Sequence, residues 1–221
     1  MPIVLHQFPA AGGVANPGYL EACELARQCA DQYSLAVMPG PGGGIATGSC
    51  WAAVAVQPNG AAGFPAAHAV NAGAAPGVGG AALTYGVVFG HSQMAAIGAA
   101  VPVPGAPPAF APHAERNALL AVAANGLALH MLPLPGAHAV MFVQLSPCGA
   151  GPGGINCLGW LNGAAAGGIA NPFAAAIGTP APGGLTLHVW YRWNHPAQVG
   201  AMVAWNGLTR ANKLADINAN W

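Results

Sequence analysis

His113-Ala114-Glu115-Arg116-Asn117-Ala118-Leu119-Leu120 is the stretch around which this 221-residue chain is organised, together with Ser146-Pro147-Cys148 and Cys157 further on. It opens an apolar helical pattern over residues 113–124 that stops at Asn125-Gly126, a typical helix end. The whole chain has only five basic and five acidic residues. A glutamate and an arginine side by side at the start of an apolar helix therefore indicate a function beyond solubility.

The residue types in these segments suit a zinc site. Zinc prefers a neutral imidazole and thiolates, which His113, Cys148 and Cys157 would supply, and three protein ligands leave a fourth position for water. Bound zinc lowers the pKa of that water to roughly 7. Glu115 is too close to His113 to be a comfortable second ligand from the same turn, but it can lie beside the water and transfer its proton. We therefore expect a zinc-dependent hydrolase.

A simpler interpretation exists for each residue alone. An acid in the first turn of a helix contributes about 0.3–1 kcal/mol against the helix dipole, so Glu115 could serve only that purpose. His113 could be a capping or core histidine. The joint occurrence of His-x-Glu with Pro147-Cys148 and with Cys157 at a second helix start favours the metal site over these alternatives.

The motifs resemble those of the zinc-dependent nucleobase deaminases. His113-Ala114-Glu115 with Asn117-Ala118 is similar to the first zinc motif of deoxycytidylate and riboflavin-pathway deaminases, and residues 146–150 are similar to the second motif of cytidine deaminases. The resemblance covers roughly residues 45–220. It implies a cytidine deaminase-like fold, a three-layer α/β/α architecture with a central mixed sheet. It also implies zinc bound by His113, Cys148 and Cys157, and Glu115 as the catalytic proton shuttle.

One feature departs from these families. Eight residues, Gly149 to Asn156, separate Cys148 from Cys157, and the spacer in the families is usually shorter. The insert is rich in glycine, which gives the backbone the freedom to loop out and return Cys157 to the metal.

The extent of the resemblance implies two parts, an N-terminal extension with one helix over residues 1–44 and a deaminase-like domain over residues 45–221. Residues 1–16 are expected to be an extended lead-in, and Asn16-Pro17 to open a helix that ends near Tyr33. Further strands and helices alternate, as in a three-layer α/β domain. The expected strands are 47–57, 82–90, 137–145 and 185–193, and the further helices are 156–166, one capped by Asn194, and 208–217.

The remaining cysteines and histidines give no second metal motif. Five cysteines at irregular spacing do not suggest a disulfide framework, and Cys23 and Cys29 are expected in the core. The other histidines are scattered and are expected in the core or at the surface: His6, His68, His91, His130, His138, His188 and His195.

No secretory signal or membrane-spanning segment is visible in the sequence. We therefore expect a soluble protein without a membrane partner that acts in a reducing, cytoplasmic compartment, after export by a specialised machine if it is an effector.

Charge and aromatic content bear on the substrate. The net charge is zero, and even full use of the five basic residues on single-stranded nucleic acid would give a salt slope of only about −3.5, at roughly 0.7 per phosphate. Stacking on some of the six tryptophans could replace phosphate contacts. Trp190 and Trp193 are equally compatible with a core position and with a wall that receives a base, and Ser146 and Pro147 are expected to help hold that base.

The expected reaction is the conversion of cytosine to uracil. The extended loops and the unusual second motif resemble the bacterial toxin-type deaminases, which implies single- or double-stranded nucleic acid as substrate, single-stranded DNA first, and an immunity protein as a further partner. Two alternatives remain open: a deaminase of a free nucleoside, nucleotide or base, and a non-catalytic protein that uses zinc for stability.

Overall fold

The computed structural model describes residues 3–9, 13–35, 48–57, 73–76, 82–92, 113–129, 131–132, 137–149, 156–163, 170–177 and 184–221. They form an α/β structure around one mixed sheet in the order β1-β8-β7-β2-β4-β3. The strands are β1 (Ile3–Gln7), β2 (Trp51–Gln57), β3 (Gly73–Pro76), β4 (Ala82–His91), β7 (Ala137–Leu145) and β8 (Leu185–Trp193), with β5 (Ala128–Leu129) beside β2 and β6 (Met131–Leu132) beside β7. The helices are η1 (Gly13–Ala15), α1 (Tyr19–Leu35), α2 (Ala114–Ala124), α3 (Cys157–Leu161), α4 (Val199–Asn206) and α5 (Arg210–Asn220).

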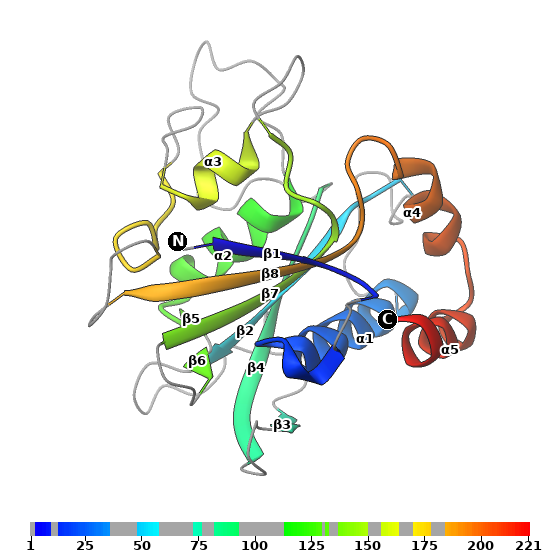
Figure 1. Ribbon diagram of the computed structural model, residues 1–221, viewed down its shortest axis with the longest axis horizontal. Helices are drawn as coiled ribbons and strands as arrows, with labels where there is room; N and C mark the ends of the chain where they lie inside the picture. Colours follow the sequence, from blue (N-terminus) through cyan, green and yellow to red (C-terminus); the bar gives the residue numbers. More distant parts are fainter. Residues whose placement is uncertain are drawn as a thin grey trace.

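Helices cover both faces of the sheet, which confirms the three-layer prediction (Figure 1). Strand β2 shows why, because its successive side chains point to opposite faces. Trp51 and Ala53 pack into the core under α1, α4 and α5, and Ala52 and Val54 pack into the core under α2 and α3. A central strand with six consecutive apolar residues, Trp51 to Val56, must be covered on both sides.

Strands β7 and β8 are parallel and end together, with Leu145 opposite Trp193. The segments that leave them, Ser146 to Cys148 and the turn after Trp193, therefore begin at the same edge of the sheet. Open α/β sheets place their binding sites outside the carboxyl ends of such strands. Both strands agree with the predicted ranges.

The N-terminal residues contribute a strand and a helix to the same sheet and core as the rest of the described chain, and the predicted boundary at residue 44 lies outside the described residues. Residues Ile3–Gln7 form β1, which pairs in parallel with β8. The predicted helix exists as α1, and Leu25 and Ala26 on it are buried against the sheet. A strand of five residues is too short to show a clear hydrophobic periodicity. Its pairing with β8, more than 180 residues further along the chain, has no signal in the local sequence.

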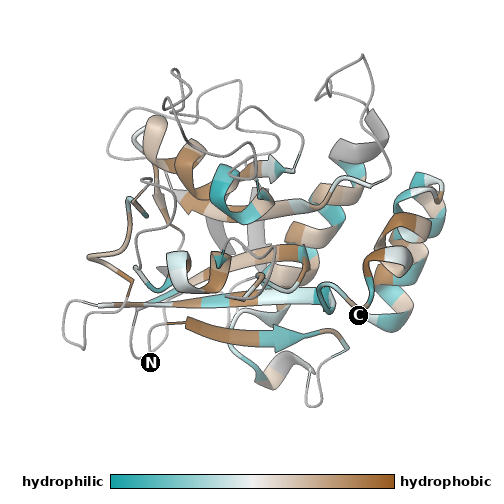
Figure 2. Cartoon of the chain, turned by 90° about the horizontal axis from the view of Figure 1, so that it is seen from above, coloured by the Kyte–Doolittle hydropathy of each residue, from teal (hydrophilic) through white to brown (hydrophobic). Residues whose placement is uncertain are grey.

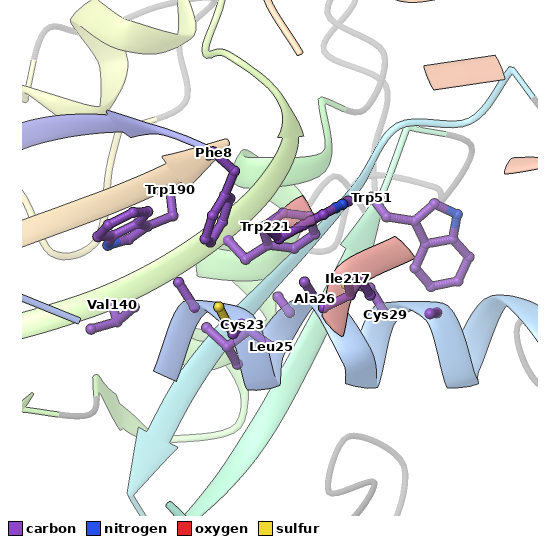
Figure 3. Packing of buried hydrophobic residues seen from close by; sticks show 14 of the residues in the cluster. Phe8, Cys23, Leu25, Ala26, Cys29, Trp51, Val140, Trp190, Ile217 and Trp221 are labelled. Carbon is purple, nitrogen blue, oxygen red and sulfur yellow. The ribbon is translucent and has the colours of Figure 1, made fainter. Parts of the chain in front are cut away.

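The core under α1 is built from aromatic rings (Figure 3). The ring centroid of Phe8 lies 4.9 Å from that of Trp190 and 5.4 Å from that of Trp221. The Tyr19 hydroxyl donates to the backbone oxygen of Trp221 (2.7 Å), and the indole N–H of Trp221 donates to Asp216 (2.8 Å). These contacts tie the C-terminal residue to α1 and to the sheet.

The boundaries of three helices differ from the prediction, and α5 (Arg210–Asn220) lies two to three residues beyond the predicted range 208–217. The described part of α3 ends at Leu161, and α4 begins at Val199 with Gln198 at its N-cap, not Asn194. The Gln198 side chain instead accepts from the backbone N–H of Asn194 (2.8 Å), so residues 194–198 form a turn before the helix. Helices α4 and α5 carry both hydrophobic and hydrophilic residues (Figure 2), as expected for helices at the surface. No helix in the described ranges is long and apolar enough to cross a membrane.

Candidate metal centre

Close packing on strand β4 fixes the start of helix α2. A Cβ atom at Gly90 would lie 2.3 Å from the carbonyl oxygen of Ala114 and 2.4 Å from the amide nitrogen of Ala118, so only glycine permits this approach. The Asn117 side chain donates to the carbonyl oxygen of His91 (3.0 Å). These contacts hold the first turn of α2 against the sheet and thereby set the position of His113.

The structure brings the three predicted ligands together. One ligand atom each from His113, Cys148 and Cys157 lies within 4.8 Å of the other two, and this group could hold a metal ion. The Cys148 sulfur is 3.8 Å from Nδ1 of His113. The three residues come from the start of α2, the segment after β7 and the start of α3.

The eight-residue spacer does not prevent Cys157 from reaching the site. Residues 150–155 lie outside the described ranges, but both ends of the spacer are placed. Asn156 adopts a left-handed conformation (φ 54°), and its side chain caps α3 by accepting from the Gly159 N–H (3.0 Å). The Leu158 N–H donates to the Cys148 carbonyl (3.1 Å), and the Cys157 N–H donates to the Cys148 sulfur (3.4 Å). Helix α3 is therefore anchored directly on the segment that carries Cys148.

The simpler interpretation of His113 does not hold. The residue occupies the N-cap position of α2, yet its side chain makes no capping hydrogen bond and contacts the Cys148 sulfur instead. Glu115 lies in the first turn, where it does complement the helix dipole. It is also only 4% exposed and lines the cavity beside His113.

The contacts within the group shift its proton affinities. Hydrogen bonds from the Cys157 thiol, from His113 and from the Cys157 N–H lower the pKa of Cys148 to about 3, although burial opposes the shift. The interaction with Cys148, burial and the charge of Glu115 raise the pKa of Cys157. Burial lowers the pKa of His113, but the hydrogen bond to Cys148 and the charge of Glu115 outweigh burial and leave it raised. Cys148 is therefore the first of the two thiols to become a thiolate, the form that binds metals.

A cavity of about 360 Å³ opens beside the three ligands. Ser146 lines it, and its hydroxyl accepts from the backbone N–H of His195 (3.0 Å). Pro147 is buried between Ser146 and Cys148, both of which line the cavity, but it is not itself among the described lining residues. The lining residues are Gly48, Cys50, Ser92, His113, Ala114, Glu115, Leu145, Ser146, Cys148, His195, Val199 and Met202.

The expectation that Trp190 and Trp193 contact the substrate is not supported. Both lie in the core under α1, where Trp190 is fully buried and Trp193 is 8% exposed. Neither belongs to the described cavity lining. The strand alternation that suggested a wall instead directs Trp190 toward Phe8, because an apolar face of a central strand is covered by the helix layer.

Sequence reasoning missed Cys50 and Ser92 in the wall of the cavity. Cys50 precedes β2 and Ser92 follows β4, and the two are joined by a pair of hydrogen bonds: Cys50 N–H to the Ser92 hydroxyl (3.0 Å) and Ser92 N–H to the Cys50 carbonyl (2.9 Å). Burial and the charge of Glu115 raise the pKa of Cys50 to about 12. No local signal could have found this pair, because only the antiparallel register of β2 and β4 brings the two residues together.

Three of the scattered histidines also meet, at the other end of the sheet. His6 Nε2 lies 2.8 Å from Nδ1 of His188, and His188 Nε2 lies 2.7 Å from Nδ1 of His138. Val4 and Val140 are the register partners of His188, so His6 and His138 are its diagonal neighbours on the same face. Of the other histidines, His68 and His130 lie outside the described residues.

Comparisons of the chain with protein-family models, with curated proteins and with solved structures gave no match. The inference of a function therefore rests on the ligand group and the cavity beside it.

Proposed function

We propose that this protein is a zinc-dependent hydrolytic deaminase that converts the cytosine ring of its substrate to uracil. One observation carries the proposal: His113, Cys148 and Cys157 converge on one point, and Glu115 lies beside them on the wall of a cavity. A ligand group with an acid next to it and room for a small molecule is the arrangement that hydrolytic metal chemistry needs.

The donor set fits zinc. Zinc–sulfur and zinc–nitrogen bonds of about 2.0–2.3 Å in a tetrahedron separate the ligand atoms by roughly 3.3–3.8 Å. The separation of 3.8 Å between Cys148 sulfur and His113 Nδ1 lies at the upper end of that range. Structural zinc sites have four protein ligands, and catalytic sites have three and an open position. Three ligands beside a cavity favour the catalytic kind over a protein that uses zinc only for stability.

The chain's own residues have distinct roles in the proposed reaction. Bound zinc would supply a Lewis acid that makes water a nucleophile near neutral pH. Glu115 would accept the first proton that water releases and deliver it to the ring nitrogen, where it stays in the product. It would then carry the remaining hydroxyl proton to the amino group, which leaves as ammonia, so water and cytosine give uracil and ammonia. Ser146, on the cavity wall, would help to orient the ring, and the buried Pro147 lies between Ser146 and Cys148.

Two substrate classes follow from the resemblance to deaminases. The likeness to the toxin-type enzymes favours nucleic acid as substrate, with single-stranded DNA as the preferred form, and an immunity protein as partner. A free cytosine nucleoside, nucleotide or base is the alternative, and the placement of the basic and aromatic side chains separates these classes.

The test is conversion of cytosine to uracil, followed by mass spectrometry, together with zinc content by elemental analysis. Glu115→Gln should keep one zinc per chain and lose activity by about 10²–10⁴-fold, because the proton shuttle is removed and the ligands remain. Glu24→Gln, at the surface of α1, is the matched control and should leave both unchanged. Bound zinc without conversion of any cytosine substrate by the wild-type protein would support the non-catalytic alternative.

A further inference from the structure

We infer that the site takes an uncharged, phosphate-free substrate, a free cytosine nucleoside, and not nucleic acid. The inference rests on the proposed deaminase function and deepens it by naming the substrate class. It follows from where the structure places every lysine, every arginine and every tryptophan of the chain.

Two of the five basic side chains are fastened between helices α1 and α5, on the surface of that layer. Arg27 forms an ion pair with Glu24 (3.5 Å) and donates twice to the Asn218 side chain (3.0 and 3.1 Å). Arg210 forms an ion pair with Asp31 (2.7 Å). Both positive charges are matched by an acid of the chain itself.

The other three basic side chains are stacked on tryptophans within the fold. Arg116 lies 5.3 Å from the centre of the Trp160 ring and is 4% exposed, and Lys213 lies 5.5 Å from the Trp205 ring and is 1% exposed. Arg192 lies 5.6 Å from the Trp221 ring and donates to the carbonyl oxygen of Phe8 (3.0 Å).

The residues outside the described ranges contain no lysine or arginine, because these five are the complete set in the sequence. None of the five lines the cavity as the structure describes it. The carboxyl group of Glu115 does line it, so a phosphate that entered with the substrate would meet an acid and no matching arginine or lysine. His113 is committed to the ligand group, which leaves His195 as the other imidazole there.

Stacking cannot replace the missing phosphate contacts through tryptophan. All six tryptophans lie in described parts of the chain, and none is more than 8% exposed: Trp51, Trp160, Trp190, Trp193, Trp205 and Trp221. Proteins that bind single strands combine a basic groove with exposed aromatic platforms. Here three of the basic groups contact indole rings, and all six indole rings are buried in the core.

The cavity itself has the size for a small ligand. Its volume of about 360 Å³ lies at the lower end of the roughly 300–1,000 Å³ of small-molecule sites. Its lining mixes apolar side chains such as Val199 and Met202 with the hydroxyl groups of Ser146 and Ser92. Hydroxyl groups of this kind suit the hydroxyls of a sugar, which need hydrogen bonds and no opposite charge.

The experiment compares three substrates with the zinc-loaded, full-length protein: cytidine, cytidine 5′-monophosphate and a single-stranded DNA oligonucleotide with one cytosine. All are assayed at pH 8, where imidazoles carry little positive charge, and at low and high salt. Oligonucleotide binding is measured separately by fluorescence anisotropy. The double variant Arg27→Gln/Arg210→Gln serves as a probe, because these two cations lie at the surface of helices α1 and α5.

We expect cytidine to be converted with kcat/KM at least tenfold above that of the monophosphate, and the oligonucleotide to remain unconverted and unbound even at low salt. The double variant should convert cytidine as the wild type does. Preferred conversion of the oligonucleotide or the monophosphate, or salt-dependent oligonucleotide binding that the double variant loses, would overturn the inference and leave the deaminase proposal standing. Silence on all three substrates by zinc-loaded protein would overturn the deaminase proposal, and the inference with it.

Discussion

The two ends of strand β7 carry two clusters of histidine and cysteine side chains that differ in what they leave available. At the carboxyl end, the ligand atoms of His113, Cys148 and Cys157 converge within 4.8 Å beside a cavity. At the amino end, His6, His188 and His138 form a line of two hydrogen bonds. The residue types are similar, but the geometry of the ring nitrogens and sulfurs is not.

The difference shows that a ligand site needs donor atoms directed at a common point, and that closeness of the side chains alone is not enough. Both ring nitrogens of His188 are already occupied by its neighbours, so the line satisfies its own hydrogen-bonding needs within the sheet. At the other end, hydrogen bonds from Cys157 and His113 converge on the Cys148 sulfur and lower its pKa to about 3. Among the described residues, the group of His113, Cys148 and Cys157 is the one that could hold a metal ion.

Loss of a ligand should have the largest effect. Cys148→Ser is expected to reduce bound zinc from one per chain to nearly none, because a hydroxyl group does not replace a thiolate ligand. Cys23→Ser, at a buried cysteine of helix α1, should keep its zinc. Elemental analysis of both proteins provides the measurement, and zinc retained by the Cys148 variant would contradict the assignment.

The second-largest effect is expected to be a loss of folding stability at acid pH, caused by the histidine cluster at the amino end of β7. Burial is the main cause that lowers the pKa of His188 to about 4, below its ordinary 6.5. The unfolded chain therefore binds more protons between these pH values, and stability falls as pH drops from 6.5 to 4, by up to about 3 kcal/mol at 1.36 kcal/mol per pKa unit.

His188→Gln should flatten that decline, because it removes the titrating ring. Burial also lowers the pKa of His91 to about 4, but His91 is present in both proteins and its contribution cancels. Urea unfolding of both proteins with chelator present, at several pH values, isolates the difference. If the free energy of unfolding falls equally with pH in both proteins, the titration of His188 does not cause the decline.

A substitution at Gly90 tests how the close contact between β4 and the start of α2 supports the ligand group. Gly90→Ala is expected to cost about 1–3 kcal/mol, as overpacking does, because the new Cβ would strike the backbone at Ala114 and Ala118. It should also weaken zinc retention by displacing His113. The matched control Gly200→Ala, where a Cβ meets nothing within 4 Å, should be neutral or slightly stabilising. Thermal unfolding and competition with a chelator measure both effects.

The smallest effect is expected away from both ends of β7. Arg210 is 55% exposed, so Arg210→Gln should change stability by less than about 1 kcal/mol and leave zinc content unchanged. The small loss should shrink further at high salt. A loss of zinc in this variant would mean that the two helices α1 and α5 control the ligand group.

Much of the fold was predictable because its signals are local. The apolar run of β7, the alternation of β8 and the helix stop at Asn125-Gly126 are written in consecutive residues, and the structure confirms them. The ligand group was predictable for the same reason: His113 and Cys148 stand directly at element ends, so their place in the chain predicts their place at the sheet edge.

The sequence by itself thus determined the three layers, the helix that begins after His113 and the chemistry of the ligand group, since each depends on short-range spacing and residue type. Only the tertiary structure decided the pairing of β1 with β8, the meeting of Cys50 with Ser92, and the burial of Trp190 away from the cavity. These features depend on strand register between distant segments. Register is set by the packing of the whole sheet, because a shift of one residue would turn every side chain of a strand to the opposite face.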